Sequence, residues 1–283
     1  MKILKQFFPE ISFLLFFFIP SLAFSSTFQR TQVLMGDVPV SITLKTSQKQ
    51  KAYHAMESAF QEVNRLNKTV SEWQPKSDAT RLNQHPLVWV PIGKDLMTIL
   101  LKAHEISEMT HGAFDVTWAS KNQKISYQDV ELIPELGLAR LSQKKMMIGV
   151  SSIAKGYIID RMVLILRKQG FRNFLINAGD IYAAGTWKVF IKCPDAHPGP
   201  CANPITLHNQ AISTSGLYER GAHIVDPRIG KRKTPYSWWS TTVIANHSFI
   251  ASPLATALFV MDPQEANSFL HERQDVRGYL FMK

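Results

Sequence analysis

The feature that most constrains the fold is a mixture of helical and strand-like hydrophobic patterns along one chain. Apolar residues recur at helical spacing over 51–66, 94–111 and 153–169. Shorter apolar runs over 40–44, 174–176, 187–191 and 241–245 predict core strands. One further short helix is predicted over 254–261. The order lacks the regular βαβ rhythm of a doubly wound parallel sheet. The sequence therefore predicts an α+β fold, with mixed sheets and packed helices in a single compact unit.

The first 25 residues have the layout of a secretory signal peptide. Two lysines precede an apolar run over 13–19, and Ala23 and Ser25 supply small residues at the cleavage position. The run is shorter than the roughly 20 apolar residues of a membrane-spanning helix. We therefore predict a signal peptide over 1–25 and one exported, periplasmic domain over 26–283. An uncleaved N-terminal membrane anchor is the less favoured alternative.

The chain has only two cysteines, Cys193 and Cys201. In an oxidising compartment a pair at this spacing is expected to form a disulfide. A metal site that also uses His197 is the alternative, but three such ligands fall short of the four that a structural zinc site needs.

The formal net charge of +10 suits an anionic ligand or an anionic membrane surface. Nucleic acid is not expected as a partner, because the chain carries an export signal. In addition, no basic run is interleaved with aromatic residues as in single-strand binders.

Side chains suited to chemistry are densest between Ser213 and Thr256. Hydroxyls, His223 and Asp226 lie there among glycines, with Arg228 and three further cations close behind. Hydroxyls and tight glycine turns can hydrogen-bond a phosphate, and cations can neutralise it. A phosphate-bearing ligand is one interpretation, and a polar hairpin with a basic tip is the other.

Three more clusters accompany this segment. Residues 111–117 join a helix end to a carboxylate, Asp115, and a hydroxyl. Residues 151–157 open a helix with two serines and Lys155, which predicts either an anion site at the helix N-terminus or an ordinary serine N-cap. Residues 177–181 form a polar turn between two predicted strands.

Taken in order, these clusters resemble the FAD:protein FMN transferase family, the ApbE-type flavin transferases. The resemblance extends from Met35-Gly36 to the C-terminus. The matching segments are Ser71-Glu72-Trp73 with Ser77 to Asn83, Gly112 to Thr117, Ile153 to Tyr157 with Asp160, Thr214 to Gly216 with Tyr218 to Arg220, and His223 to Gly230. Because the segments occur in the same order as in the family, together they support the resemblance more strongly than any one of them does alone.

The resemblance implies a T-shaped α+β fold that binds FAD outside the cytoplasm. It also implies transfer of the FMN half of FAD to a threonine hydroxyl of an acceptor protein, with release of AMP. Phosphoryl transfer of this kind normally uses Mg²⁺. Membrane subunits of a redox complex are candidate acceptors.

The resemblance also names the candidate site residues. Those expected to bind FAD are Met35, Trp73, Ala113, Phe114, Asp115, Lys155, Thr214 and His223. Trp73 is expected to stack on the flavin. His223 is the candidate catalytic residue, because a near-neutral imidazole can take the proton of the acceptor hydroxyl; a structural histidine is the alternative.

The expected Mg²⁺ ligands depart from the family pattern. They are a carbonyl at Ala154 and the side chains at Ser252 and Thr256, but Ser252 stands where the family has aspartate. A neutral hydroxyl is a poorer ligand for a hard cation than a carboxylate. Gly149 replaces another family aspartate, and the turn that ends at Asp180 is one glycine short.

Two hypotheses follow from this departure. In the first, the protein is an active transferase in which Asp180, Asp226 or phosphate oxygens of the substrate supply the missing charge. Hydrolysis of FAD to FMN and AMP is a variant of this hypothesis. In the second, the protein is a non-catalytic, periplasmic FAD-binding relative.

Overall fold

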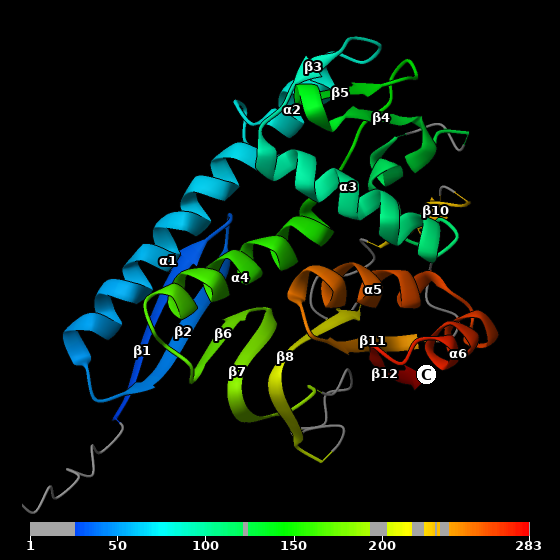
Figure 1. Cartoon of the computed structure of the whole chain (residues 1–283). Coiled ribbons are helices and arrows are strands. Elements are labelled where there is room, and N and C mark those ends of the chain that lie inside the picture. The colour runs from blue at the N-terminus through cyan, green and yellow to red at the C-terminus, as the bar shows by residue number, and fades with distance from the viewer. Residues whose placement is uncertain are drawn as a thin grey trace, which may run out of the picture.

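The structure is a computed structural model (Figure 1), which describes residues 26–120, 124–192, 203–216, 224–229, 231–232 and 238–282. The predicted signal peptide, the cysteine pair Cys193 and Cys201, and the candidate catalytic residue His223 lie outside these residues. Within the described part, no helix is long and apolar enough to cross a membrane.

A seven-stranded sheet forms the centre of the molecule, and each of its strands is antiparallel to its neighbours. In spatial order the strands are β1 (Ser26–Leu34), β2 (Val38–Thr46), β6 (Phe174–Ala178), β7 (Asp180–Val189), β8 (Ile205–Gly216), β11 (Trp238–Ala245) and β12 (Arg277–Met282). Two small antiparallel sheets accompany it, formed by β3 (Val90–Pro91), β5 (Leu138–Leu141) and β4 (Val130–Ile133), and by β9 (Val225–Asp226) and β10 (Lys231–Arg232).

Helices pack on the central sheet and on one another (Figure 1). They are α1 (Lys49–Val70), α2 (Asp78–Gln84), α3 (Lys94–Met109), α4 (Ser151–Lys168), α5 (Ser248–Val260) and α6 (Pro263–Glu272), with short 3-10 turns at Val116–Ala119, Tyr127–Asp129 and Pro134–Leu136. The apolar face predicted for α1 is buried at each turn, from Ala52 to Leu66. The prediction of an α+β fold in one compact unit is therefore confirmed.

Two glycines end helices as the sequence predicts. Gly112 has φ +75° after α3, and its N–H donates to the carbonyl of Ser107 at 2.8 Å. Gly170 has φ +89° after α4. The left-handed conformation at these positions favours glycine, so these helix ends are encoded locally.

The start of α5 differs from the prediction. The helix begins at Ser248, six residues before the predicted start, and Pro253 lies inside it. The carboxylate of Asp160, on α4, accepts hydrogen bonds from the backbone N–H groups of Ser248 and Phe249 at 3.0 and 3.1 Å. This cap comes from a residue 88 positions earlier in the chain, so no local pattern could indicate it.

The contact between α4 and α5 depends on Gly156. A Cβ atom at this position would lie 2.2 Å from the carbonyl oxygen of Ser248. The two helix backbones therefore approach more closely than any other residue type would permit. This close approach sets the distance between side chains of α4 and those of α5.

Candidate functional site

A buried carboxylate, Asp180, is the centre of the most polar part of the core. It follows a tight turn between β6 and β7, in which Gly179 has φ +86°. Only 2% of Asp180 is exposed. Its Oδ1 accepts a hydrogen bond from Ser213 at 2.5 Å, and its Oδ2 lies 2.8 Å from the hydroxyl of Ser252 and 3.1 Å from Nζ of Lys155.

These groups come from four elements that the fold brings together. Lys155 lies on α4, Asp180 on β7, Ser213 on β8 and Ser252 on α5. A buried carboxylate is costly unless it is paired and hydrogen-bonded, and here one ammonium group and two hydroxyls compensate it. Lys155 is partly exposed, so this charge pair reaches the surface from the core.

Further oxygens surround Ser252. Its hydroxyl also lies 2.9 Å from the carbonyl oxygen of Ser152, and because it has one hydrogen it donates to only one of its two acceptors at a time. One helical turn later, the hydroxyl of Thr256 lies 3.2 Å from that of Ser215. We call this group the Asp180 cluster, which consists of the Ser152 carbonyl and the side chains of Lys155, Asp180, Ser213, Ser215, Ser252 and Thr256.

Three of the residues that the resemblance names lie in the Asp180 cluster: Lys155, Ser252 and Thr256. Ala154 is close by in the first turn of α4, but the carbonyl that meets Ser252 is that of Ser152. Thr214 does not join the cluster. Its hydroxyl lies 2.8 Å from that of Thr242, its partner on β11, and side chains alternate along a strand. Thr214 therefore faces away from Ser213 and Ser215.

The N-terminus of α4 is covered by a carboxylate from the segment that follows α1. Oε1 of Glu72 accepts a hydrogen bond from the N–H of Ser151 at 3.1 Å, while its Oε2 is buried without a hydrogen-bond partner in the described part of the chain. The residue at the N-cap is Val150, which makes no side-chain cap. The expectation of a serine N-cap is therefore wrong, and the carboxylate of Glu72 takes one backbone donor at this helix start.

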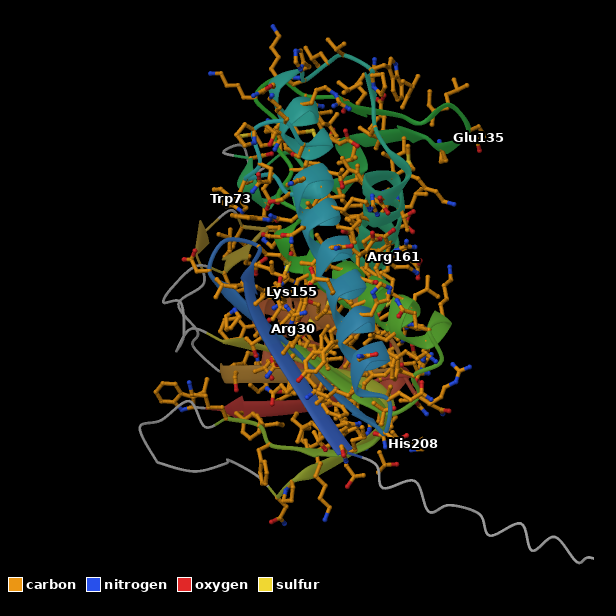
Figure 2. All side chains as sticks on the ribbon, turned by 90° about the vertical axis from the view of Figure 1, so that its left-hand side faces the viewer. Arg30, Trp73, Glu135, Lys155, Arg161 and His208 are labelled. Atoms are coloured by element: carbon orange, nitrogen blue, oxygen red, sulfur yellow. The ribbon has the colours of Figure 1, made fainter. Side chains whose placement is uncertain are left out.

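Trp73 follows Glu72 directly and is 75% exposed. Figure 2 shows Trp73 above Lys155, toward the upper end of the molecule. Its position beside the start of α4 leaves its ring available for stacking.

The segments 112–117 and 226–228 meet at a second place. They line a hollow of about 310 Å³, whose lining residues are His111, Gly112, Asp115, Ile125, Ser126, Tyr127, Gln128, Pro227 and Arg228. The guanidinium of Arg228 bonds to the carboxylates of Asp226 at 3.0 Å and of Glu265 at 2.6 Å. Arg228, which lines this hollow, is thus paired with two acidic side chains.

Asp115 acts first on the backbone of its own loop. Its carboxylate accepts hydrogen bonds from the N–H groups of Thr117 at 2.7 Å and Tyr127 at 2.8 Å. Burial raises the pKa of Asp115, and these hydrogen bonds oppose that rise. Ala113 and Phe114 are buried in the hydrophobic core. These three predicted FAD-binding residues therefore shape the loop, whatever they contact in addition.

Met35 lies in the turn between β1 and β2. Its φ is +54°, the next residue Gly36 has φ +88°, and its half-buried side chain packs against the core. The remaining predicted residue, His223, is outside the described part of the chain, so the structure does not relate it to the Asp180 cluster.

Sequence reasoning did not single out Glu72 or the carbonyl of Ser152 as site residues. Glu72 belongs to the segment in which Trp73 is the predicted flavin-binding residue. Nothing in the sequence indicates that Glu72 contacts Ser151, which is 79 positions away. Asp180 was considered as a source of negative charge, and the structure brings it against Ser252 across 72 positions.

The described residues contain no group of three or more His, Cys, Asp or Glu side chains that could hold a metal ion. The donors of the Asp180 cluster are instead one carboxylate, one carbonyl and several hydroxyls. Oxygen donors of this kind are those that Mg²⁺ prefers.

Comparison with known proteins identifies the family. The model of the ApbE family matches residues 36–280. Relatives named FAD:protein FMN transferase include that of Haemophilus influenzae, which is 25% identical over 84% of this chain and 80% of the relative. That of Vibrio cholerae is 25% identical over 75% of this chain and 76% of the relative. That of Klebsiella pneumoniae is 33% identical, over 50% of this chain and 48% of the relative.

Solved structures share the fold. The ApbE protein of Thermotoga maritima superposes with a TM-score of 0.81 at 23% identity, over 91% of this chain and 94% of that one. The flavin transferase ApbE from Vibrio cholerae gives a TM-score of 0.78 at 20% identity, over 91% of this chain and 97% of that one. The matched family model spans nearly the whole described structure, so this chain belongs to the ApbE family.

Proposed function

We propose that this protein is an FAD:protein FMN transferase that moves the FMN half of FAD to a threonine hydroxyl of an acceptor protein. The observation that carries the proposal is the Asp180 cluster, which gathers one ammonium group and several hydroxyls around a buried carboxylate near the start of α4. A diphosphate needs both cationic and hydrogen-bonding partners. FAD, the substrate that the name of the relatives implies, contains such a diphosphate.

The diphosphate and the flavin ring of FAD each have a partner in this arrangement. Lys155 is the cation nearest the buried carboxylate and is partly exposed, so its ammonium group can exchange Asp180 for a substrate phosphate. Trp73 offers an open ring for stacking on the flavin, a contact worth about 1–3 kcal/mol for an aromatic ring system.

The cluster suits Mg²⁺ held jointly by protein and substrate. Mg²⁺ usually takes one or two carboxylates together with substrate phosphates, rather than an all-protein cage. The residues that would hold it are Asp180, Ser252, Thr256 and the carbonyl of Ser152. When bound, the ion would neutralise charge on the phosphate oxygens. Asp180 thereby offers a carboxylate in place of the one that the family has at Ser252.

The proposed reaction replaces the phosphoanhydride bond of FAD with a phosphoester bond to the acceptor threonine. A bond forms between the acceptor threonine oxygen and the phosphorus of the FMN half, and the bond from that phosphorus to the bridging oxygen breaks, which releases AMP. The hydroxyl proton passes to a base, for which His223 remains the candidate. Lys155 and the hydroxyls of the cluster hold the diphosphate so that attack and departure are in line.

The acceptor is proposed to be an exported protein, because residues 1–25 have the layout of a signal peptide. A membrane subunit of a redox complex with a periplasmic threonine would satisfy this requirement. Transfer in the periplasm would bring enzyme and acceptor into one compartment.

The experiment that tests this function measures AMP release from FAD with and without Mg²⁺. Membranes of cells that lack the gene are present to supply the acceptor threonine, and the same membranes without enzyme are the blank. Purified protein should release AMP only when Mg²⁺ is present, and Asp180→Asn should release it at least tenfold more slowly. Asp275→Asn, which removes an exposed carboxylate paired with Arg273, is the matched control and should behave as wild type. Tight FAD binding with no AMP release at any Mg²⁺ concentration would instead establish a non-catalytic FAD-binding protein.

A further inference from the structure

Four segments of the chain meet at the lower end of the molecule, the end that His208 marks in Figure 2. They are residues 45–51, 167–173, 184–188 and 206–210, which we call the basic end. Its lysines and arginines are Lys45, Lys49, Lys51, Arg167, Lys168, Arg172 and Lys188. The four segments contain no aspartate or glutamate.

Short distances between the segments place them against one another. The N–H of Lys45 donates to the carbonyl of Asn173 at 3.0 Å. A Cβ atom on Gly170 would lie 3.6 Å from Nζ of Lys51. The N–H of Gly185 donates to the side chain of Asn209 at 3.0 Å. A Cβ atom on Gly185 would lie 3.4 Å from the carbonyl oxygen of Arg172. The basic end is therefore one continuous surface, although its parts are up to 165 positions apart in the chain.

The cations of the basic end point outward. All except Arg167 are exposed. Nζ of Lys45 lies 4.1 Å from the centre of the Trp187 ring, so this lysine rests on an aromatic platform at the surface. The first carboxylate along α1 after Lys51 is that of Glu57, and it bonds to Arg30 at 2.9 Å. Glu57 therefore balances a cation outside the basic end.

The chain enters the fold at this same end. Ser26, the first described residue, pairs with Thr46 in the β1–β2 ladder, next to Lys45. The apolar run over 13–19 ends seven residues before Ser26. Seven residues span at most about 25 Å. While the apolar run at the export membrane is still joined to the rest of the chain, it therefore holds the basic end close to that membrane.

We propose that the basic end docks on the anionic phospholipid headgroups of the membrane. Lysine and arginine clusters beside a membrane-directed segment are attracted by the negative surface potential of anionic lipids. That attraction decays within a Debye length of roughly 8 Å at physiological ionic strength, so the cations must lie at the surface that faces the lipid. The absence of acidic residues from the four segments meets this requirement.

This orientation leaves the Asp180 cluster accessible. Helix α4 runs from Lys155, in the cluster, to Lys168, in the basic end. Thirteen residues of helix correspond to about 20 Å. The docked protein would hold its cluster within roughly that distance of the headgroups, where the periplasmic face of a membrane-embedded acceptor is within reach.

The inference does not depend on the proposed function, and a vesicle assay tests it. The protein from residue 26 to residue 283 contains every described helix and strand, and removing residues 1–25 removes the apolar run that would itself insert into lipid. Binding is measured by co-sedimentation with vesicles of phosphatidylglycerol and phosphatidylcholine, and with vesicles of phosphatidylcholine alone.

The test variant replaces four exposed cations of the basic end by glutamate: Lys49→Glu, Lys168→Glu, Arg172→Glu and Lys188→Glu. The control makes the same change of charge at the opposite, upper end of the molecule: Lys68→Glu, Lys76→Glu, Lys94→Glu and Lys144→Glu. All eight side chains are exposed. Equal circular dichroism spectra and melting temperatures of the two variants establish that both are folded.

We expect wild type to bind anionic vesicles, and raised salt to weaken this binding. The basic-end variant should bind at least tenfold more weakly, while the control stays within about twofold of wild type. Equal losses in both variants would overturn the proposal, since net charge alone would then explain binding. Wild type that binds neither vesicle, or both equally, would overturn it as well.

Discussion

At the scale of single residues, the most informative pair is Asp180 and Ser252. Their side chains lie 2.8 Å apart, and Lys155 is the cation that balances the carboxylate. A chain with aspartate at both positions would place two carboxylates side by side in a buried site, and a bound cation would be needed to hold them. With serine at 252, one carboxylate is balanced by Lys155 in the protein itself.

A substitution at 252 tests this balance. Ser252→Asp should lower the melting temperature in EDTA, because two adjacent buried carboxylates repel each other. Added Mg²⁺ should restore the melting temperature, and Mg²⁺ affinity should rise about tenfold over wild type, because a cation that binds only the folded state stabilises it. Calorimetric melting and titration measure both quantities. Ser252→Asn is the neutral control, and the idea fails if Mg²⁺ has the same effect on both variants.

Trp73 should contribute to FAD affinity through its exposed ring. Trp73→Ala should weaken FAD binding by about 1–3 kcal/mol, which is roughly 5- to 150-fold in Kd. Titration followed by flavin fluorescence measures the change. Trp89→Ala removes a tryptophan that lies against Arg140 and should leave the affinity unchanged. An unchanged Kd in Trp73→Ala would show that the flavin lies elsewhere.

At the scale of elements, the sequence predicted what is encoded locally. The helices α1, α3 and α4 follow from their apolar periodicity, and two of their ends follow from glycines at Gly112 and Gly170. The start of α5 and the capping partner of α4 could not be predicted, because the carboxylates of Asp160 and Glu72 that accept these backbone N–H groups come from distant parts of the chain. Caps supplied by tertiary contacts leave no signal in the residues next to the helix.

The contact between α4 and α5 should be intolerant of any side chain at Gly156. Alanine would gain about 1 kcal/mol in helix propensity. Its Cβ would lie 2.2 Å from a backbone oxygen, however, and overpacking of this kind costs about 1–3 kcal/mol or more. Gly156→Ala should therefore lower the melting temperature by several degrees and weaken FAD binding. Leu164→Ala, on the exposed face of α4, is the control; equal effects of the two substitutions would contradict this reading.

An ion-pair network ties α1 to α4. Glu62 bonds to Arg65 at 2.7 Å and to Arg161 at 3.1 Å, and the hydrogen bond from Arg65 is the main cause that lowers the pKa of Glu62. A carboxyl group whose pKa is lower in the folded state stabilises the fold above its unfolded pKa of about 4.3, and this stabilisation is lost as the pH falls through the folded pKa.

Glu62→Gln should therefore lower the free energy of unfolding by about 1 kcal/mol at pH 7, because both arginine partners are substantially exposed. The difference from wild type should shrink toward zero near the folded pKa. Urea denaturation at several pH values measures it. Glu105→Gln removes a more exposed ion pair with Lys102 and should change little at any pH. A difference that stays constant with pH would rule out the ionic explanation.

At the scale of the whole molecule, the fold separates two tasks. The Asp180 cluster lies at one end of α4 and the basic end lies at the other. The fold class and the family could be predicted from the sequence, because several short segments occur in the family's order. The cluster could not be assembled from the sequence, because its members lie on four elements and Asp180 meets Ser252 across 72 positions. Only the paired strands β7 and β8 and the packed helices α4 and α5 bring them together.

The central claim is that this protein attaches FMN to a threonine of another exported protein. The most direct measurement is mass spectrometry of periplasmic and membrane proteins from cells that carry the gene and from cells that lack it. We predict that a threonine-linked FMN peptide is present with wild type, absent without the gene, and strongly reduced with Asp180→Asn. FAD bound to wild-type protein in those cells, together with no FMN-modified threonine in any exported protein, would contradict the account.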